Sequence, residues 1–241
     1  MNTNIVTLEE MAVVEEDAFR RAGLDLLGHS RRMLKDLRIA RVPEGRGIAR
    51  LVNLLQWDVG EHMEYLDGEV VAADQVVHFA MHHIWDQKLG SDHPLKMLFA
   101  ECMASASDIY LVGKLSHAGE ETDFLADTLE SFGSYFEMYS SEEELEELVI
   151  QVVEEPFETM IEAARYLFEL GSCLLEQVID MDKLILFQDH LFYPLAHHYN
   201  ISNWVLTIRN RFPNNPDIME GTTTLENLPS DEATWLKLFK I

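Results

Sequence analysis

The fold is decided by the stretch Asp74-Gln-Val-Val-His78-Phe-Ala-Met-His82-His83-Ile-Trp-Asp86, whose apolar residues recur at helical spacing. Residues four apart share one face of a helix, so Asp74, His78 and His82 lie above one another. On a helical wheel at roughly 100° per residue, Asp74 falls inside the apolar arc and both histidines lie along its edge. A buried carboxylate or imidazole without a partner is costly. We therefore expect each of these side chains to have a hydrogen bond, a counter-charge or a metal ion.

Helical patterns also occupy most of the chain on either side of this stretch. Two Ser/Thr-x-x-Glu capping boxes, at 7–10 and 141–144, mark helix starts, Asp92 is expected to cap another helix, and Pro94 and Pro156 suit a first turn. The expected helices cover residues 7–38, 48–66, 69–89, 92–115, 120–138, a segment from 141, 157–178, and one or two within 181–211. Strand patterns are sparse, so the sequence predicts an all-α fold, a multi-helix up-down bundle of about eight or nine helices.

The last thirty residues differ in character from the rest of the chain. Residues 212–230 contain Pro-Asn-Asn-Pro, Gly-Thr-Thr-Thr and Asn-Leu-Pro, which are typical of loops. Residues 231–241 carry Trp235 and Phe239 but are short for an independent helix, so we expect them to dock onto the body of the chain or, alternatively, onto a partner. The sequence thus predicts a single helical bundle at 1–211 and a loop-rich tail at 212–241 that ends in a short docking helix.

The composition indicates a cytoplasmic protein. Cys102 and Cys173 lack the spacing of a disulfide or CxxC framework, which favours reduced thiols. The N-terminus does not have the basic and apolar regions of a signal peptide, and no run approaches the roughly 20 apolar residues of a membrane span.

Charge is distributed unevenly along the chain. There are 43 acidic and 18 basic residues, a net charge of −25, yet residues 1–50 hold 9 basic and 8 acidic residues. Residues 115–164 contain 15 Asp or Glu and no Lys or Arg. Such a surface repels phosphate, so we expect no binding of nucleic acid or membranes; basic proteins or peptides and cations are favoured instead. The alternative is a face that serves only solubility, and a homodimer is left open.

Asp and His four residues apart recur on three successive expected helices: Asp25 with His29, Asp58 with His62, and Asp74 with His78. His82 extends the third pair by another turn. Helical bundles build metal sites by projecting imidazoles and carboxylates inward from facing helices. An Asp one turn before a His also serves as an orienting hydrogen-bond partner for that ligand. The alternative for each pair is an ordinary contact on a solvated helix surface.

A second histidine group lies near the end of the expected bundle. His190 and His197 are seven residues apart, and they fall within about 20° of each other if the helix continues through Pro194. Both could then face one cavity with His78 and His82. The alternative is that they make hydrogen bonds to backbone or carboxylates in the core.

The order of His29, His62 and then His78 with His82 on successive helices resembles the histidine order of the hemerythrin-like (HHE) helical bundles. The resemblance covers about half of the chain, roughly residues 20–130, and implies a non-haem di-iron or related metal site. The chain departs from the family pattern at two carboxylates. Leu66 stands four residues after His62, and Thr122 stands five residues after His117.

These patterns predict a metal-binding helical-bundle protein, most simply a non-haem iron or di-iron protein in O₂ binding, O₂ activation or redox chemistry. The metal is divalent, with iron favoured and manganese or zinc open. The candidate ligands are His78, His82, Asp74, His29, His62, His190 and His197. The alternative is a non-enzymatic acidic protein that binds a basic partner, as a chaperone, an adaptor or an immunity-type inhibitor does. Motifs such as GxSxG and HExxH do not occur, so the sequence assigns no catalytic residue and leaves open whether the protein is an enzyme.

Overall fold

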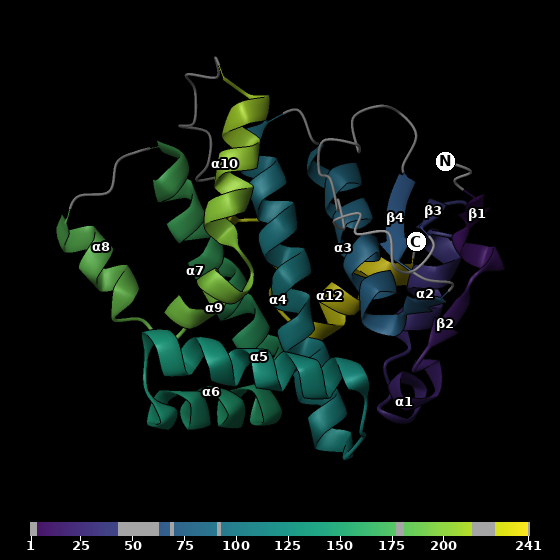
Figure 1. Cartoon of the computed structure of the whole chain (residues 1–241), viewed down its shortest axis with the longest axis horizontal. Helices are drawn as coiled ribbons and strands as arrows, with labels where there is room; N and C mark the ends of the chain where they lie inside the picture. The colour runs from purple at the N-terminus through teal and green to yellow at the C-terminus, as the bar shows by residue number, and fades with distance from the viewer. Residues whose placement is uncertain are drawn as a thin grey trace.

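A computed structural model of the chain is organised around one long buried helix, α4 (Pro94–Ala118). The structure describes residues 4–42, 63–67, 70–90, 93–176, 181–213 and 225–240. Helix α4 packs against α3 (Ala73–Leu89) and against α7 (Pro156–Glu176), and Figure 1 shows it at the centre of the molecule between them. Most α4 side chains are therefore buried, including nearly every apolar residue from Leu95 to Leu115.

Shorter helices surround this centre. Helices α5 (Asp123–Tyr139) and α6 (Glu142–Glu154) form a layer along the bottom of Figure 1, and α8 (Met181–Gln188) lies at its left-hand edge. The other helices of the described residues are α1 (Glu16–Arg21), α2 (Leu26–Met33), α9 (Tyr193–His198), α10 (Ile201–Arg211) and α12 (Glu232–Lys237). The predicted all-α, multi-helix fold is confirmed.

The N-terminal segment corrects one prediction, because residues 7–38 do not form a single helix. They form η1 (Leu8–Glu10), β2 (Ala12–Val14), α1 and α2, flanked by β1 (Asn4–Thr7) and β3 (Arg38–Val42). The capping box is present, since the Thr7 backbone N–H donates to Glu10 Oε2 at 2.8 Å, but it opens only a 3₁₀ turn. Glu15 and Gly23, with φ of 65° and 74°, interrupt the helical path on either side of α1.

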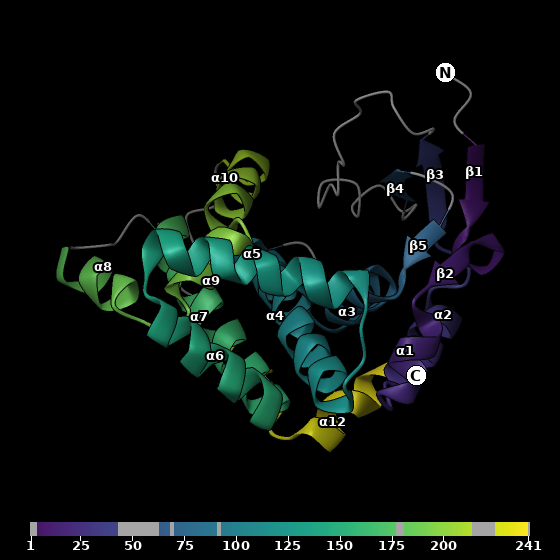
Figure 2. The ribbon, with the colours of Figure 1, turned by 60° about the horizontal axis from the view of Figure 1, so that its bottom comes forward.

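The strands form two small sheets at the edge of the molecule, on the far side from α8 in Figure 2. In one sheet β3 lies antiparallel to β1 and parallel to β4 (Met63–Asp67); in the other, β2 lies parallel to β5 (Val70–Ala72). The helix expected at 48–66 is therefore wrong at its end, which is β4, and residues 48–62 lie outside the described part. Partners distant in the chain stabilise such strands, so local periodicity does not reveal them.

Helix α4 approaches the junction of α6 and α7 closely at Gly113. A Cβ atom there would lie 2.1 Å from the Val152 carbonyl oxygen and 2.6 Å from Pro156 Cβ. Ser141 caps the start of α6, with the Glu144 N–H donating to Ser141 Oγ at 3.2 Å, as one half of the predicted capping box requires. The bottom layer and the central helix therefore meet through backbone, with no room for a side chain at this point.

The C-terminal helix α12, followed by η4 (Leu238–Lys240), lies against the body of the chain. Trp235 is fully buried, and its ring centroid lies 4.6 Å from that of Tyr110 on α4. The Tyr110 hydroxyl donates to Glu232 Oε1 at 2.6 Å. A ring contact and a hydrogen bond together dock this short helix, while the division into 1–211 and 212–241 stays a prediction.

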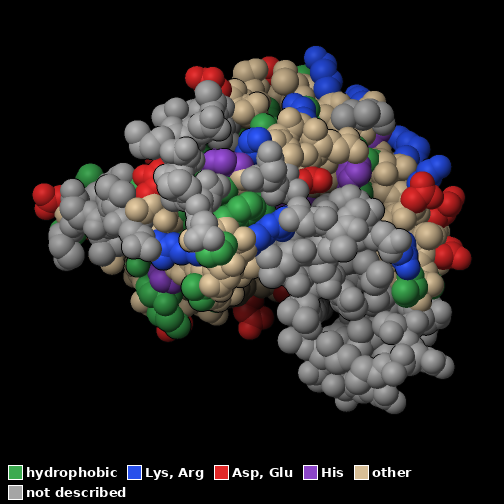
Figure 3. Space-filling model, turned by 90° about the horizontal axis from the view of Figure 1, so that it is seen from above, with side chains coloured by type: hydrophobic (Ala, Val, Ile, Leu, Met, Phe, Trp, Pro, Cys, Tyr) green, Lys and Arg blue, Asp and Glu red, His purple; other side chains and the backbone are tan. Residues whose placement is uncertain are grey.

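Several composition-based expectations have a structural counterpart. Cys102 and Cys173 are free thiols and both are buried. Among the described helices, none combines the length and the apolar character that a membrane crossing requires. Figure 3 shows Lys and Arg side chains next to Asp and Glu side chains at the right-hand edge, where the N-terminal elements lie in Figure 1. This mixture agrees with the nearly balanced charge of residues 1–50.

Candidate metal centre

The hairpin of α3 and α4 sets the register of the candidate site. Gly90, with φ of 78°, ends α3, and His93 caps α4 by accepting the Leu95 N–H at its Nδ1 (3.2 Å). The cap is therefore His93, whereas Asp92, the predicted cap, lies outside the described residues. Because the connection is short, the two helices run antiparallel, and residues equally distant from it face each other. This register sets His82 opposite Glu101.

Three ligand-type side chains converge between the two helices. His82 Nε2 lies 3.2 Å from Glu101 Oε2, and one ligand atom from each of His78, His82 and Glu101 lies within 4.8 Å of the other two. The two imidazole centroids are 4.9 Å apart, as expected one turn apart on α3. No other set of three or more His, Cys, Asp or Glu among the described residues converges in this way.

The group is buried in an apolar setting. His82 and Glu101 are each 3% exposed, and His78 is half-buried. The predicted orientation of these histidines, along the edge of the apolar arc and toward the core, matches this placement. Ser105, one turn after Glu101 on α4, donates from Oγ to Glu101 Oε1 at 3.2 Å. Oε2 makes no hydrogen bond of good geometry within the described chain, so this oxygen is available to a cation.

The protonation states at neutral pH suit metal binding. Burial, reinforced by the neighbouring His82, lowers the pKa of His78 to about 4, so this imidazole is neutral and has a free lone pair. Burial pushes the pKa of Glu101 upward, but its contacts with His82, His78 and Ser105 outweigh that effect and hold the pKa below its usual value. Neutral imidazole and ionised carboxylate are the forms that coordinate metals.

Two His and one carboxylate form a ligand set with known chemistry. Non-haem Fe(II) centres use this set and keep coordination positions open, and catalytic zinc sites also use two His and one Glu. A structural zinc site, in contrast, is closed by four protein ligands. The described residues thus provide the ligand number of a centre that leaves room for water or a substrate.

A row of further polar groups continues from this centre along α3 and α4. Asp74 lies one turn before His78, and Asp108 lies on the facing helix α4. Burial raises the pKa of Asp108 well above its usual value, and the nearby charges of Asp74 and Glu101 add to the shift. Burial, together with Asp108, also raises the pKa of Tyr199, which is 8% exposed. Asp74 thus borders the centre without belonging to the convergent group.

The structure does not bring His29 or His197 to this group. His29 lies on α2, where its Nδ1 is 2.6 Å from Arg32 Nη2. His197 stacks on Tyr139 of α5, with ring centroids 3.8 Å apart. His62 lies outside the described residues.

His190 is also separate, for a clear reason. The helix does not continue through Pro194, because α8 ends at Gln188 and α9 begins at Tyr193. The intervening turn directs His190 against Tyr166 of α7, at a centroid distance of 4.5 Å. Among the described residues, His190 and His197 therefore do not join the group that His78 and His82 form.

Sequence reasoning missed Glu101. The available signal was a single Glu in the apolar run that follows Pro94, flanked by Ala100 and Cys102. Combined with the short hairpin connection, this position would have suggested a partner on α3. A carboxylate that is 3% exposed requires such a partner.

The fold and the site together define an all-α protein with a buried two-histidine, one-glutamate ligand group. A scan of protein-family models found no match to this chain, and searches of curated proteins and of solved structures found none either. The geometry of this ligand group is therefore the observation that indicates a function.

Proposed function

We propose that this protein binds a divalent transition-metal ion through His78, His82 and Glu101. The observation that carries the proposal is the convergence of three ligand atoms within 4.8 Å inside an apolar core. A buried carboxylate next to two imidazoles is costly without compensation, and a cation between them compensates all three at once. The ligands come from two packed helices, which limits their movement before the ion arrives.

Iron is the metal that we favour, and redox or O₂ chemistry is the function that it supports. The ligand set is that of two-His, one-carboxylate iron centres, which bind O₂ and substrate at their open positions. The half-buried His78 offers a route of approach from solvent. Manganese and zinc bind the same kinds of ligand atom. The identity of the bound metal ion must therefore be found by metal analysis of the protein, because the ligand types do not distinguish these ions.

Metal analysis of the purified chain tests the proposal. We expect about one metal ion per chain by mass spectrometry after expression in medium supplemented with iron, manganese and zinc. The double variant His78→Ala with His82→Ala should lose that metal. His83→Ala is the matched control, because His83 lies on the same helix and makes a contact to Gln87 at 2.8 Å outside the group. Sub-stoichiometric metal in the wild type, or equal loss in the control, contradicts the proposal.

A second measurement addresses the chemistry. Anaerobic loading with Fe(II), followed by exposure to O₂, should produce a spectroscopic change that the His78→Ala, His82→Ala variant lacks. Loading with Fe(II) and no response to O₂ would leave metal binding intact and reject the redox function. The resemblance to hemerythrin-like bundles stays a prediction, because no family model matches the chain.

The second candidate function is binding of a basic partner. Its supporting observation is α6, where Glu142, Glu143, Glu146 and Glu147 are exposed in a stretch without Lys or Arg. Electrostatic attraction of this kind weakens steeply with salt. Changing these four residues to Gln should weaken capture of a basic protein such as histone H1 at low salt, and unchanged capture would reject this candidate.

A further inference from the structure

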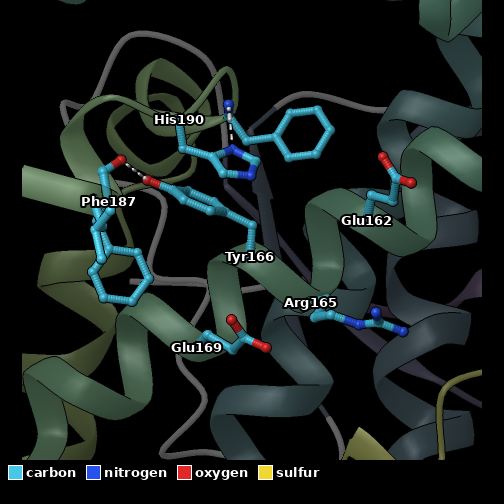
Figure 4. Close-up of a pocket in the computed structure, with 8 residues that line it drawn as sticks. Glu162, Arg165, Tyr166, Glu169, Phe187 and His190 are labelled. Atoms are coloured by element: carbon cyan, nitrogen blue, oxygen red, sulfur yellow. Dashed lines mark hydrogen bonds between the residues drawn. The ribbon is translucent and has the colours of Figure 1, made fainter. Parts of the chain in front are cut away.

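A second feature, unrelated to the metal centre, is a cleft between α7 and the segment that links α8 to α9. Its volume is ≈ 560 Å³, and Figure 4 shows the residues that line it. Helices α8 and α3 lie on opposite sides of α4 in Figures 1 and 2, so this cleft and the metal centre are separate. The centre's ligands take no part in it.

One wall of the cleft is aromatic and held in place by hydrogen bonds. The His190 ring stacks on Tyr166 with centroids 4.5 Å apart and an interplanar angle of 25°. The Tyr166 hydroxyl donates to the Phe187 carbonyl at 2.8 Å, which ties α7 to the end of α8. The wall is therefore a fixed, flat surface.

His190 adds no positive charge to the cleft at neutral pH. Its Nδ1 accepts the Phe192 N–H at 3.2 Å, so the neutral ring carries its proton on Nε2. Burial lowers the pKa of His190, although Glu162 and Glu169 oppose the shift. The exposed ring thus offers a neutral aromatic surface.

Two carboxylates flank the aromatic wall. Glu162 and Glu169 lie one turn before and one turn after Tyr166 on the same face of α7, and both are exposed. Neither takes part in an ion pair among the described residues. Figure 4 shows the guanidinium of Arg165 on the side of α7 away from the His190 and Tyr166 stack. The lining therefore has two carboxylates and one guanidinium, and its charge is more negative than positive.

We propose that this cleft binds an organic cation, a guanidinium or protonated alkylamine group carried on an apolar chain. A flat guanidinium stacks face to face on the exposed His190 ring, which the buried Tyr166 ring supports from behind. The carboxylates of Glu162 and Glu169 accept its N–H donors in charge-assisted hydrogen bonds. Leu186, which is 73% exposed at the rim, offers contact to the apolar chain of the ligand. The group reaches the cleft either on a free polyamine or on an arginine of a basic peptide.

Titration with small probes tests this site on the full chain. The probes are benzamidine, spermidine and N-acetyl-arginine amide, with benzoate as the anionic control, and the readout is the ring proton resonances of His190, assigned with His190→Gln. We expect saturable shifts with the cations and none with benzoate. Tighter binding of spermidine identifies a free polyamine as the source, and tighter binding of the arginine amide identifies a peptide.

Charge variants make the test specific. Glu162→Gln with Glu169→Gln should weaken cation binding about three- to tenfold, as expected for two exposed ion pairs. Arg165→Gln should strengthen it, because it removes the nearby like charge. Glu158→Gln, also exposed on α7 but outside the cleft, is the control and should change nothing. Shifts with benzoate, no shift with any cation, or equal binding in the double variant and the control overturns the proposal.

Discussion

His82 Nε2 and Glu101 Oε2 face each other at 3.2 Å across the interface of α3 and α4. Two ligands that each lie about 2.0–2.2 Å from one metal ion are themselves about 3 Å apart. The separation of this pair is therefore already that of two atoms on a shared ion. A ligand atom of His78, one turn away on α3, lies within 4.8 Å of a ligand atom of each of the other two residues.

Glu101→Gln should abolish tight metal binding, because an amide replaces the only carboxylate of the convergent group. Loss of an outer hydrogen-bond partner typically weakens metal affinity about 10–100-fold, so loss of a ligand should exceed that range. Competition with a chromophoric chelator measures the affinity.

Asp108→Asn on the same helix is the matched control. Burial raises the pKa of Asp108 well above its usual value, which favours its neutral form, and Asn is close to that form in shape. Metal affinity should stay within about threefold of the wild type. An equal loss in both variants would show that any polar change between α3 and α4 disrupts the site.

His198 should make the metal-free protein sensitive to mild acid. Burial lowers its folded-state pKa to about 4, whereas its unfolded value is 6.5, so protonation favours the unfolded chain. The contribution of neutral His198 to the free energy of unfolding is therefore full above pH 6.5, and it is lost as the pH is lowered toward 4. From pH 7 to pH 5 the free energy of unfolding should drop by about 2 kcal/mol from this group. Urea unfolding measures the drop.

His198→Gln should reduce that drop, because Gln does not titrate and its amide can still form a hydrogen bond with Ser131 Oγ, which lies 2.8 Å from His198 Nδ1. His78 adds a shift of the same sign in metal-free protein, so some pH dependence should persist. A variant with the full wild-type drop would contradict the buried, neutral state of His198.

Gly113→Ala should destabilise the protein strongly. Its new methyl group would overlap the Val152 carbonyl oxygen, a backbone atom that cannot rotate away, and the cost should be about 2–4 kcal/mol. Gly133→Ala is the control, because its nearest neighbour would be Leu145 Cδ2 at 4.0 Å. There the better helix propensity of Ala should stabilise by up to about 1 kcal/mol. Thermal unfolding of both variants provides the comparison.

Trp235→Ala should cost about 3–5 kcal/mol, the range for removing a large buried aromatic side chain. The fully buried ring contacts Tyr110, Phe157 and Phe239, so its removal should also release the C-terminal helix to proteases. Leu206→Ala, at a position 56% exposed, should change stability little. Limited proteolysis of Trp235→Ala that leaves the C-terminus intact would contradict the docking of α12.

Sequence reasoning succeeded where the signal is local. Ser141 and Pro156 marked true helix starts because capping and proline chemistry act within one turn. The edge-of-arc position of His78 and His82 followed from helical geometry alone. The helix predicted at 48–66 is wrong at Met63–Asp67, because these residues form strand β4, which is stabilised by pairing with the distant strand β3.

Of the three residues of the candidate site, the sequence predicted His78 and His82 but not Glu101, because only the two histidines are related by local helix geometry. Two ligands lie on one helix at four-residue spacing, which the sequence displays. The third, Glu101, belongs to the next helix, and its apolar neighbours gave no pattern that links it to His82. His190 and His197 would share one helix face, as His78 and His82 do, only if the helix were unbroken. The turn before Tyr193 interrupts it.

The helical character of this chain and the inward direction of two imidazoles on α3 can be read from the residues alone, because both properties depend on neighbours within one or two turns. The meeting of Glu101 with those imidazoles, and the place of His190 in a separate cleft, follow from the packing of helices that are distant in the chain. Such pairings depend on how antiparallel helices align and where the chain turns, and these are set by packing over the whole molecule.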